Sequence, residues 1–330
     1  MDKNVPCLNG KKSSRVMGIL YIDLWNRPNK SPLMAQYTIR CSKKMDFCYE
    51  QNWLKETPLT LILRNDVDGK LLDSLLKTTT LSPPNVLMFY HEMGHTMHSL
   101  ISSTEFQHLS GTRGAVDFAE FPSHLFELFF QSSSFPASLM PSSSSIELSY
   151  SVENYLRFQR RFSHLDALHL LLQAEMDQRS ASLNPLYTTK SVENHIHSWF
   201  STSSLLNQSF PSTPGALPLY ALMGVPPPSQ FTHLLHYGGT YYAYLYCKVS
   251  SSFVWEKAFQ RSCWNATAGR ELRKVLEKGC LDCTIHRLLH LVEACHHFDE
   301  TVPPINFSEI KEFPQKIPLE PFLRDIQWKE

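Results

Sequence analysis

Two histidines and a glutamate in this sequence are spaced as a metal site requires. His91 and His95 are four positions apart, and Glu92 directly follows the first histidine. On a helix, residues four apart lie on one face, so both imidazoles could bind the same ion. Catalytic zinc takes three protein ligands and a water, whose proton Glu92 could remove as general base. The pattern predicts metal-assisted hydrolysis, and a surface helix that merely carries two histidines is the alternative.

Two carboxylates further along the chain could complete such a site. Glu120 lies at the start of the next predicted helix and is available as a third ligand. Asp117 lies about one helical turn before it. A carboxylate at that position could orient a ligand imidazole through its free N–H, or it could be the helix N-cap.

A tyrosine stripe is the second region whose residue types could do chemistry. Tyr237, Tyr241 and Tyr244 are spaced i, i+4 and i+7, which would align them on one helix face, and the stripe begins beside a glycine pair that predicts a mobile loop. Phenol O–H groups and the nearby His233 imidazole could stabilise the oxyanion that forms when an amide is attacked. Half-buried packing of the tyrosines is the alternative.

Three segments together resemble the thimet oligopeptidase family: HEMGHTMHSL at 91–100, SGTR at 110–113 and DFAEFPS at 117–123. The resemblance implies one zinc ion as cofactor, Glu120 as its third protein ligand, and hydrolysis of short or unfolded peptides. With the ligand set complete, His98 and His108 are expected to be packing or surface residues. The tyrosine segment resembles the family's glycine-rich loop and YxxxYYxY helix, which implies a role in stabilising the tetrahedral intermediate for His233, Tyr237, Tyr241 and Tyr244.

The sequence departs from the family pattern in two respects. His236 stands in the glycine-rich loop where the family usually has a small residue, and an imidazole there could stiffen the loop. Family members are also roughly twice as long, and their helical N-terminal half forms the other wall of the substrate channel. The chain therefore resembles a C-terminal catalytic half, and we expect one catalytic domain over 1–330.

A second group of possible metal ligands lies towards the C-terminus. Cys280, Cys283, His286 and His290 are suitable atom types for structural zinc, but finger-type sites separate the two pairs by about twelve residues. Here all four fall on what is predicted to be one helix, where they cannot easily surround an ion. Helix packing is the favoured interpretation.

The secondary structure predicted around these residues indicates a mainly α-helical, α+β fold. Three short strands, at 18–25, 36–40 and 59–63, predict a small antiparallel sheet in a strand-rich lead-in over 1–80. Helices are predicted at 86–101, 118–130, 153–178, 241–259 and 270–297, within a helical zinc-binding part over 81–330, and 211–230 is predicted to be a loop. The family resemblance implies that this part is zincin-like.

Composition excludes several other classes. The chain has 330 residues, 31 basic against 31 acidic, so it offers no electrostatic footprint for nucleic acid. No apolar run is long enough to span a membrane, no presequence is visible, and eight scattered cysteines fit a reduced compartment. The resemblance implies the mitochondrial matrix, with the cytoplasm as the alternative.

Two functions follow from these patterns. The first is an active zinc endopeptidase that trims short peptides, including imported mitochondrial precursors. The second is a truncated, catalytically incompetent half that binds zinc and acts by binding a peptide or a partner.

Overall fold

The structure is a computed structural model that describes residues 17–26, 28–30, 34–42, 59–68, 82–132, 146–182, 224, 230–281 and 284–296. Most of the described residues are helical, as expected. The chain forms two compact units, 1–81 with 92–114 and 272–282, and 82–91 with 115–271 and 283–330. The predicted loop over 211–230 lies almost wholly outside the described residues.

A three-stranded sheet belongs to the first unit. It consists of β1 (Ile19–Asn26), β2 (Ala35–Arg40) and β3 (Leu59–Asp68), in the order β1-β3-β2. The predicted strands are confirmed, but the antiparallel arrangement was wrong, because β1 pairs with β3 in parallel and β2 pairs with β3 antiparallel. β3 inserts between two strands that run in opposite directions, so it must be parallel to one of them.

Helix α3 (Pro83–Ile101) carries the first motif and contributes to both units. It begins after Ser82, whose carbonyl accepts hydrogen bonds from the N–H groups of Asn85 and Val86 at 2.9 and 3.0 Å. Proline at the first helical position suits this start, because its missing N–H would have no partner in the helix. Along α3, buried residues are interleaved with partly exposed ones; Glu92 is buried, whereas His91 and His95 are partly exposed.

The second unit is built from helices that differ from the predicted ones mainly at their breaks. The segment predicted as one helix over 118–130 forms α4 (Val116–Ala119) and α5 (Phe121–Gln131), which are separated at Glu120. The 241–259 helix forms α12 (Tyr242–Val254) and a π-helical turn, η6 (Trp255–Phe259). The 270–297 helix is two helices, α13 (Ala266–Glu277), whose residues from Leu272 onward belong to the first unit, and α14 (Thr284–His296). Helix α7 extends over Ile146–Ser182.

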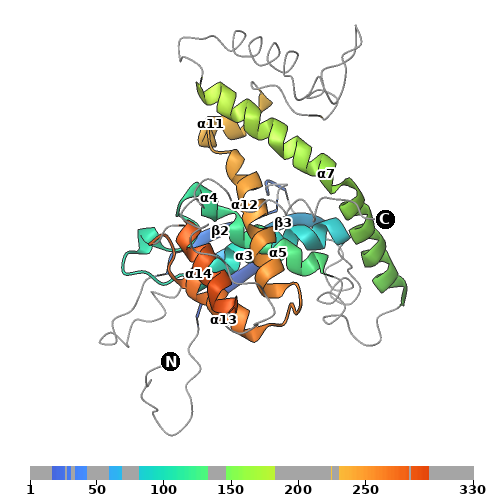
Figure 1. The fold of residues 1–330 in the computed structure, drawn as a ribbon. Helices are drawn as coiled ribbons and strands as arrows, with labels where there is room; N and C mark the ends of the chain where they lie inside the picture. The colour runs from blue at the N-terminus through green and yellow to red at the C-terminus, as the bar shows by residue number, and fades with distance from the viewer. Residues whose placement is uncertain are drawn as a thin grey trace. The chain divides into compact units, whose positions relative to one another are not determined.

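The core of the second unit lies around α12. In Figure 1, α12 runs beside α5, and their contact is the most extensive between helices of the described residues. Phe121 and Leu125 of α5 and Val254 of α12 are fully buried, and they are joined by Leu291 of α14. Burying each such side chain contributes roughly 1.5–3 kcal/mol, so this cluster fixes α5 relative to α12.

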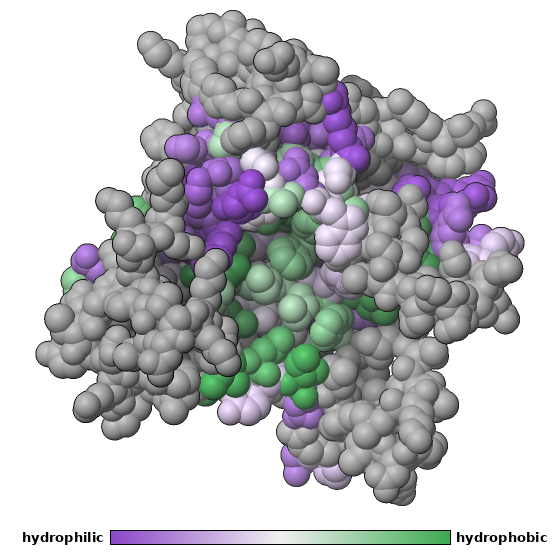
Figure 2. All heavy atoms as spheres, turned by 90° about the horizontal axis from the view of Figure 1, so that it is seen from below, coloured by the Kyte–Doolittle hydropathy of each residue, from purple (hydrophilic) through white to green (hydrophobic). Residues whose placement is uncertain are grey.

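Apolar side chains also remain on the described surface. Figure 2 shows them gathered towards the middle of the face seen from below. On α7, Phe158 is 61% and Phe162 38% exposed, and their ring centroids are 4.8 Å apart. None of the described helices combines the length and hydropathy that a membrane span requires.

Candidate metal centre

Helix α3 places His91 and His95 one turn apart, as the motif predicted. Both imidazoles are partly buried, which removes competing water without sealing the site. Glu120 lies in the break between α4 and α5, where its backbone (φ −96°, ψ −2°) forms the N-cap of α5. The Glu120 Oε2 atom is 3.4 Å from His91 Nε2.

The donor atoms of His91, His95 and Glu120 all lie within 4.8 Å of one another. Ligands about 2.1 Å from a tetrahedral zinc ion stand about 3.4 Å apart, which matches the distance between His91 Nε2 and Glu120 Oε2. The hydroxyl of Ser123 donates to Glu120 Oε2 at 2.8 Å and so holds the carboxylate in place. Two imidazoles and one carboxylate fit a catalytic zinc site in both atom type and spacing.

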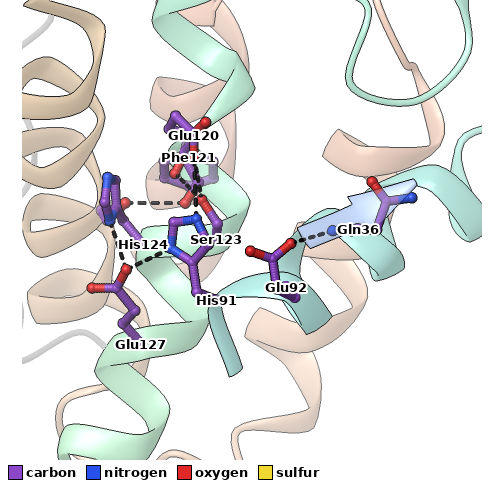
Figure 3. Close-up of polar contacts among 9 residues, drawn as sticks. Gln36, His91, Glu92, Glu120, Phe121, Ser123, His124 and Glu127 are labelled. Atoms are coloured by element: carbon purple, nitrogen blue, oxygen red, sulfur yellow. Dashed lines mark hydrogen bonds and ion pairs between the residues drawn. The ribbon is translucent and has the colours of Figure 1, made fainter. Parts of the chain in front are cut away.

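A second carboxylate, Glu127, was missed in the sequence. Figure 3 shows it two turns after Glu120 on α5, in contact with two imidazoles. Its Oε1 atom is 2.6 Å from His91 Nδ1 and 3.0 Å from His124 Nδ1. The seven-residue interval from Glu120 puts both carboxylates on one face of a helix, and this interval could have identified Glu127.

His91, His124 and Glu127 also form a group with metal-binding atom types. Their separations of 2.6 and 3.0 Å are hydrogen-bond lengths, and both imidazoles share one carboxylate oxygen, so each contact holds a proton rather than an ion. A His91 imidazole that donates from Nδ1 to Glu127 presents its Nε2 atom to Glu120. This carboxylate–histidine arrangement is the usual support of a zinc-binding imidazole.

The charges around His91 are strongly coupled. Burial alone would lower the pKa of His91, but hydrogen bonds to Glu120 and Glu127 outweigh it and raise the pKa to about 10. Burial opposes ionisation of Glu127, yet His124, Lys248 and His91 hold the pKa of this carboxyl well below its usual range. Glu127 is therefore an anion across the physiological range, as an orienting carboxylate must be.

Glu92 is buried and its orientation is fixed by the sheet. The backbone N–H of Gln36, on β2, donates to Glu92 Oε2 at 2.6 Å (Figure 3). This bond ties the carboxylate of Glu92 to the edge of the sheet. The sequence predicted the residue but not this anchor, which lies 56 positions away.

The tyrosine segment is not one continuous helix. The short helix α11 (His233–Tyr237) ends before the glycine pair, and α12 begins at Tyr242. The turn requires glycine at Gly239, whose φ is +81°. The prediction of one helical face was therefore wrong, because the turn interrupts the helix.

The turn nevertheless brings the predicted rings together around His233. Its ring centroid is 5.3 Å from that of Tyr237, 4.7 Å from Tyr241 and 6.0 Å from Tyr244. Burial lowers the pKa of His233, so this imidazole is neutral at physiological pH. The side chain of His236 lies outside the described residues.

Tyr244 is the tyrosine that the structure places beside the candidate metal ligands. Its ring centroid is 6.5 Å from that of His124. Burial, followed by the negative charge of Glu120, raises the pKa of Tyr244 far above its usual value and keeps its O–H protonated. Within the described part of the chain its hydroxyl has no hydrogen-bond partner, whereas Tyr241 donates to Gln173 Oε1 at 2.7 Å. Tyr237 is 62% exposed.

Asp117, His98 and His108 are not members of the two candidate metal-binding groups of the described residues. Asp117 is not the N-cap, since Ala115 is the N-cap of α4, and the carboxylate that accepts a hydrogen bond from His91 Nδ1 is Glu127 instead. His98 is buried and His108 is exposed. Of the second group of possible metal ligands, towards the C-terminus, Cys283 and the His286 side chain lie outside the described residues, so that hypothesis is not tested.

A small cavity adjoins the Glu127 side of the candidate centre. It measures about 80 Å³ and is lined by α5, α7 and α12, including His124, Glu127 and Lys248. Such a volume admits a few atoms, not a peptide segment. It gives the Glu127 network a solvent-sized space on one side.

Comparison with known proteins is consistent with this geometry. Residues 5–295 match the description Peptidase family M3. A relative from Malassezia globosa named mitochondrial intermediate peptidase is 31% identical over 312 residues, covering 81% of this chain and 35% of the relative. One of the same name from Neurospora crassa is 32% identical over 303 residues, covering 80% and 36%. The matched part therefore spans about a third of the length of these relatives.

Proposed function

Because the chain belongs to peptidase family M3, we propose that it is a zinc metalloendopeptidase. His91, His95 and Glu120 are the proposed metal ligands, and Glu92 is the proposed general base. The observation that carries this assignment is the 3.4 Å separation between His91 Nε2 and Glu120 Oε2. His91 lies on α3, the helix that also carries Glu92 and His95. His91 and His95 on one helix, together with the carboxylate of Glu120, would make the fold zincin-like, within one catalytic domain.

The proposed mechanism divides the chemistry among four groups of this chain. A bound zinc ion would lower the pKa of its water and polarise the scissile carbonyl. Glu92 takes the proton of the attacking water and delivers it to the leaving amine. Tyr244 donates its O–H to the developing oxyanion, and Glu127 keeps His91 in the tautomer that binds through Nε2.

The three tyrosines and His233 are proposed to contribute to different extents to stabilising the oxyanion. Tyr244 is the principal oxyanion donor because its hydroxyl is available and its ring lies beside His124. Tyr237 is exposed and could contact substrate, while Tyr241 and His233 pack behind Tyr244. All four remain candidates for stabilising the tetrahedral intermediate.

Replacing Tyr244 with phenylalanine should lower kcat by about 10²–10³-fold, the loss typical of one oxyanion donor. Zinc content and KM should change little, because the ring still packs against Tyr241 and His233. Steady-state cleavage of a quenched fluorescent peptide measures this split. Tyr150→Phe, at a 66% exposed position on α7, is the matched control. Full kcat in Tyr244→Phe would remove the residue from the mechanism.

Replacing Glu127 with glutamine should weaken zinc binding about 10–100-fold, the usual cost of losing an outer carboxylate. Both imidazoles contact the same oxygen, Oε1, which glutamine keeps, but the amide is neutral and so accepts their N–H groups more weakly than the carboxylate does. Competition with a chromophoric chelator gives the zinc Kd. Glu153→Gln, which breaks only the exposed ion pair with Arg157, is the control. An unchanged Kd would show that Glu127 does not support the ligand.

Substrates and compartment follow from the relatives and are proposals. Relatives named mitochondrial intermediate peptidase suggest short or unfolded precursor peptides as substrates, in the mitochondrial matrix. No nucleic-acid or membrane partner is proposed. The proposed cofactor is one zinc ion.

A second candidate function is favoured by the exposed aromatic pair on α7. Phe158 and Phe162 are large, adjacent and exposed, as expected of a surface that binds a partner. The chain would then be a zinc-binding but catalytically incompetent half.

Zinc analysis together with peptide cleavage separates the two functions. The protein is assayed as prepared, after removal of metal with a chelator, and after zinc is added back. Turnover that disappears and returns with zinc supports the peptidase. One zinc per chain without turnover supports the binding half, and no zinc binding contradicts both.

A further inference from the structure

Helix α7 contacts the tyrosine segment through a buried carboxylate that no sequence motif identified. Asp177 has no exposed surface. Its Oδ1 accepts the backbone N–H of Gly239 at 2.7 Å, and its Oδ2 accepts the backbone N–H of Tyr241 at 2.8 Å. One side chain therefore holds both sides of the turn between α11 and α12.

The charge of Asp177 suits this position. The N-terminal N–H groups of a helix lack partners within the helix, and the helix dipole favours a negative charge there. Tyr241 is the N-cap of α12, but its own side chain makes no capping bond. Asp177 supplies from α7 the cap that α12 lacks locally. Two backbone donors on one fully buried carboxylate also satisfy the charge that burial would otherwise penalise.

Two glutamines on α7 reinforce the same attachment. Gln173, four residues before Asp177 and on the same helix face, accepts the hydroxyl of Tyr241 at 2.7 Å. Gln178 donates its side-chain N–H to the carbonyl of Gly239 at 2.7 Å. The glycine turn, which its sequence suggested would be mobile, is thus held to α7 by its backbone on both sides.

The attachment determines where the reactive tyrosines lie. α12 starts at Tyr242, so fixing the N–H of Tyr241 fixes the first turn of the helix, which carries Tyr244. The rings of Tyr241 and Tyr244 are 5.0 Å apart, and Tyr244 lies beside His124. Displacing this turn by about 1 Å would move a hydroxyl out of hydrogen-bond range of a reacting atom.

We infer that Asp177 is a positioning residue for the proposed peptidase reaction, which clamps the glycine turn and the start of α12 so that Tyr244 faces the metal centre. This inference rests on the proposed function for its catalytic consequence. The clamp itself does not depend on activity and can be measured separately.

The variants Asp177→Asn and Asp177→Ala test the inference in the full chain. Asparagine keeps the volume and one acceptor but cannot accept the second N–H. Glu175→Gln is the matched control, because it lies two residues away on α7 and loses only a surface pair with Arg179. Hydrogen–deuterium exchange of the peptide spanning 234–245, thermal unfolding, zinc content, kcat and KM are measured for each protein.

Exchange at the turn is expected to accelerate about tenfold or more in both Asp177 variants, since a hydrogen bond to a charged group is lost. It should stay unchanged in Glu175→Gln. With zinc content retained, kcat should fall about 10–100-fold while KM changes little, and Asn should be milder than Ala.

Two results would overturn the inference. Wild-type exchange at the turn in both Asp177 variants would show that there is no clamp. Faster exchange with full kcat would show that the clamp does not position Tyr244. If the wild type itself lacks turnover, the proposed function fails, while the exchange measurement still decides whether the clamp exists.

Discussion

Glu92→Gln is expected to lower kcat about 10²–10⁴-fold while the protein still holds one zinc ion per chain. Glutamine preserves the shape of the side chain and an oxygen that can accept the Gln36 N–H, so the attachment to β2 should persist. The amide cannot take a proton from the attacking water. Activity should therefore be lost without loss of metal or of folding. Zinc analysis, thermal unfolding and cleavage of a quenched fluorescent peptide measure the three quantities on one preparation.

The control for this experiment is a carboxylate that lies outside the proposed chemistry. Glu105 is exposed, and Glu105→Gln removes the same charge from the surface. It should leave kcat unchanged. Full turnover in Glu92→Gln would exclude Glu92 as general base, and loss of zinc in this variant would instead indicate that the negative charge of Glu92 maintains the site.

Glu120→Ala should have a still larger effect on metal binding. Losing an outer carboxylate costs about 10–100-fold in affinity, and losing one of three direct ligands should cost more. The variant should contain no zinc under conditions in which the wild type holds one ion, and its turnover should be undetectable. Metal content after dialysis against a weak chelator, together with peptide cleavage, measures both effects.

The neighbouring Ser123 provides the matched comparison. Ser123→Ala keeps the ligand and removes only the hydroxyl that donates to Glu120 Oε2 at 2.8 Å. It should retain zinc with reduced affinity. Equal zinc affinity in Glu120→Ala and wild type would exclude Glu120 as a ligand and would direct attention to the group of His91, His124 and Glu127.

The exposed aromatic pair on α7 gives the alternative function, partner binding, a physical basis. It is not evidence against a catalytic role for the candidate metal centre. Phe158 and Phe162 are exposed, whereas the carboxylate of Glu127 and the ring of His124 are almost fully buried. A binding half would need no buried hydrogen-bond network behind a metal ligand. The network around His91 is what a catalytic site requires to hold an imidazole in one tautomer.

The sequence by itself determined those features that depend on residues close together along the chain. His91 and His95 are four residues apart on one helix, so their spacing alone predicted their common face, with Glu92 directly after the first of them. The strand positions and the mainly helical fold followed from local periodicity in the same way. The family resemblance supplied Glu120 and Tyr244, which pattern alone could only offer as candidates.

Only the tertiary structure decided the contacts between distant segments. Gln36 meets Glu92 across 56 positions, and Asp177 meets Gly239 across 62. The parallel pairing of β1 with β3 also depends on where β3 inserts. Helical and strand periodicities encode which side of an element is buried, but not which partner covers it. The sequence therefore specified the groups that could do chemistry, and the packing of α5, α7 and α12 decided which atoms support them.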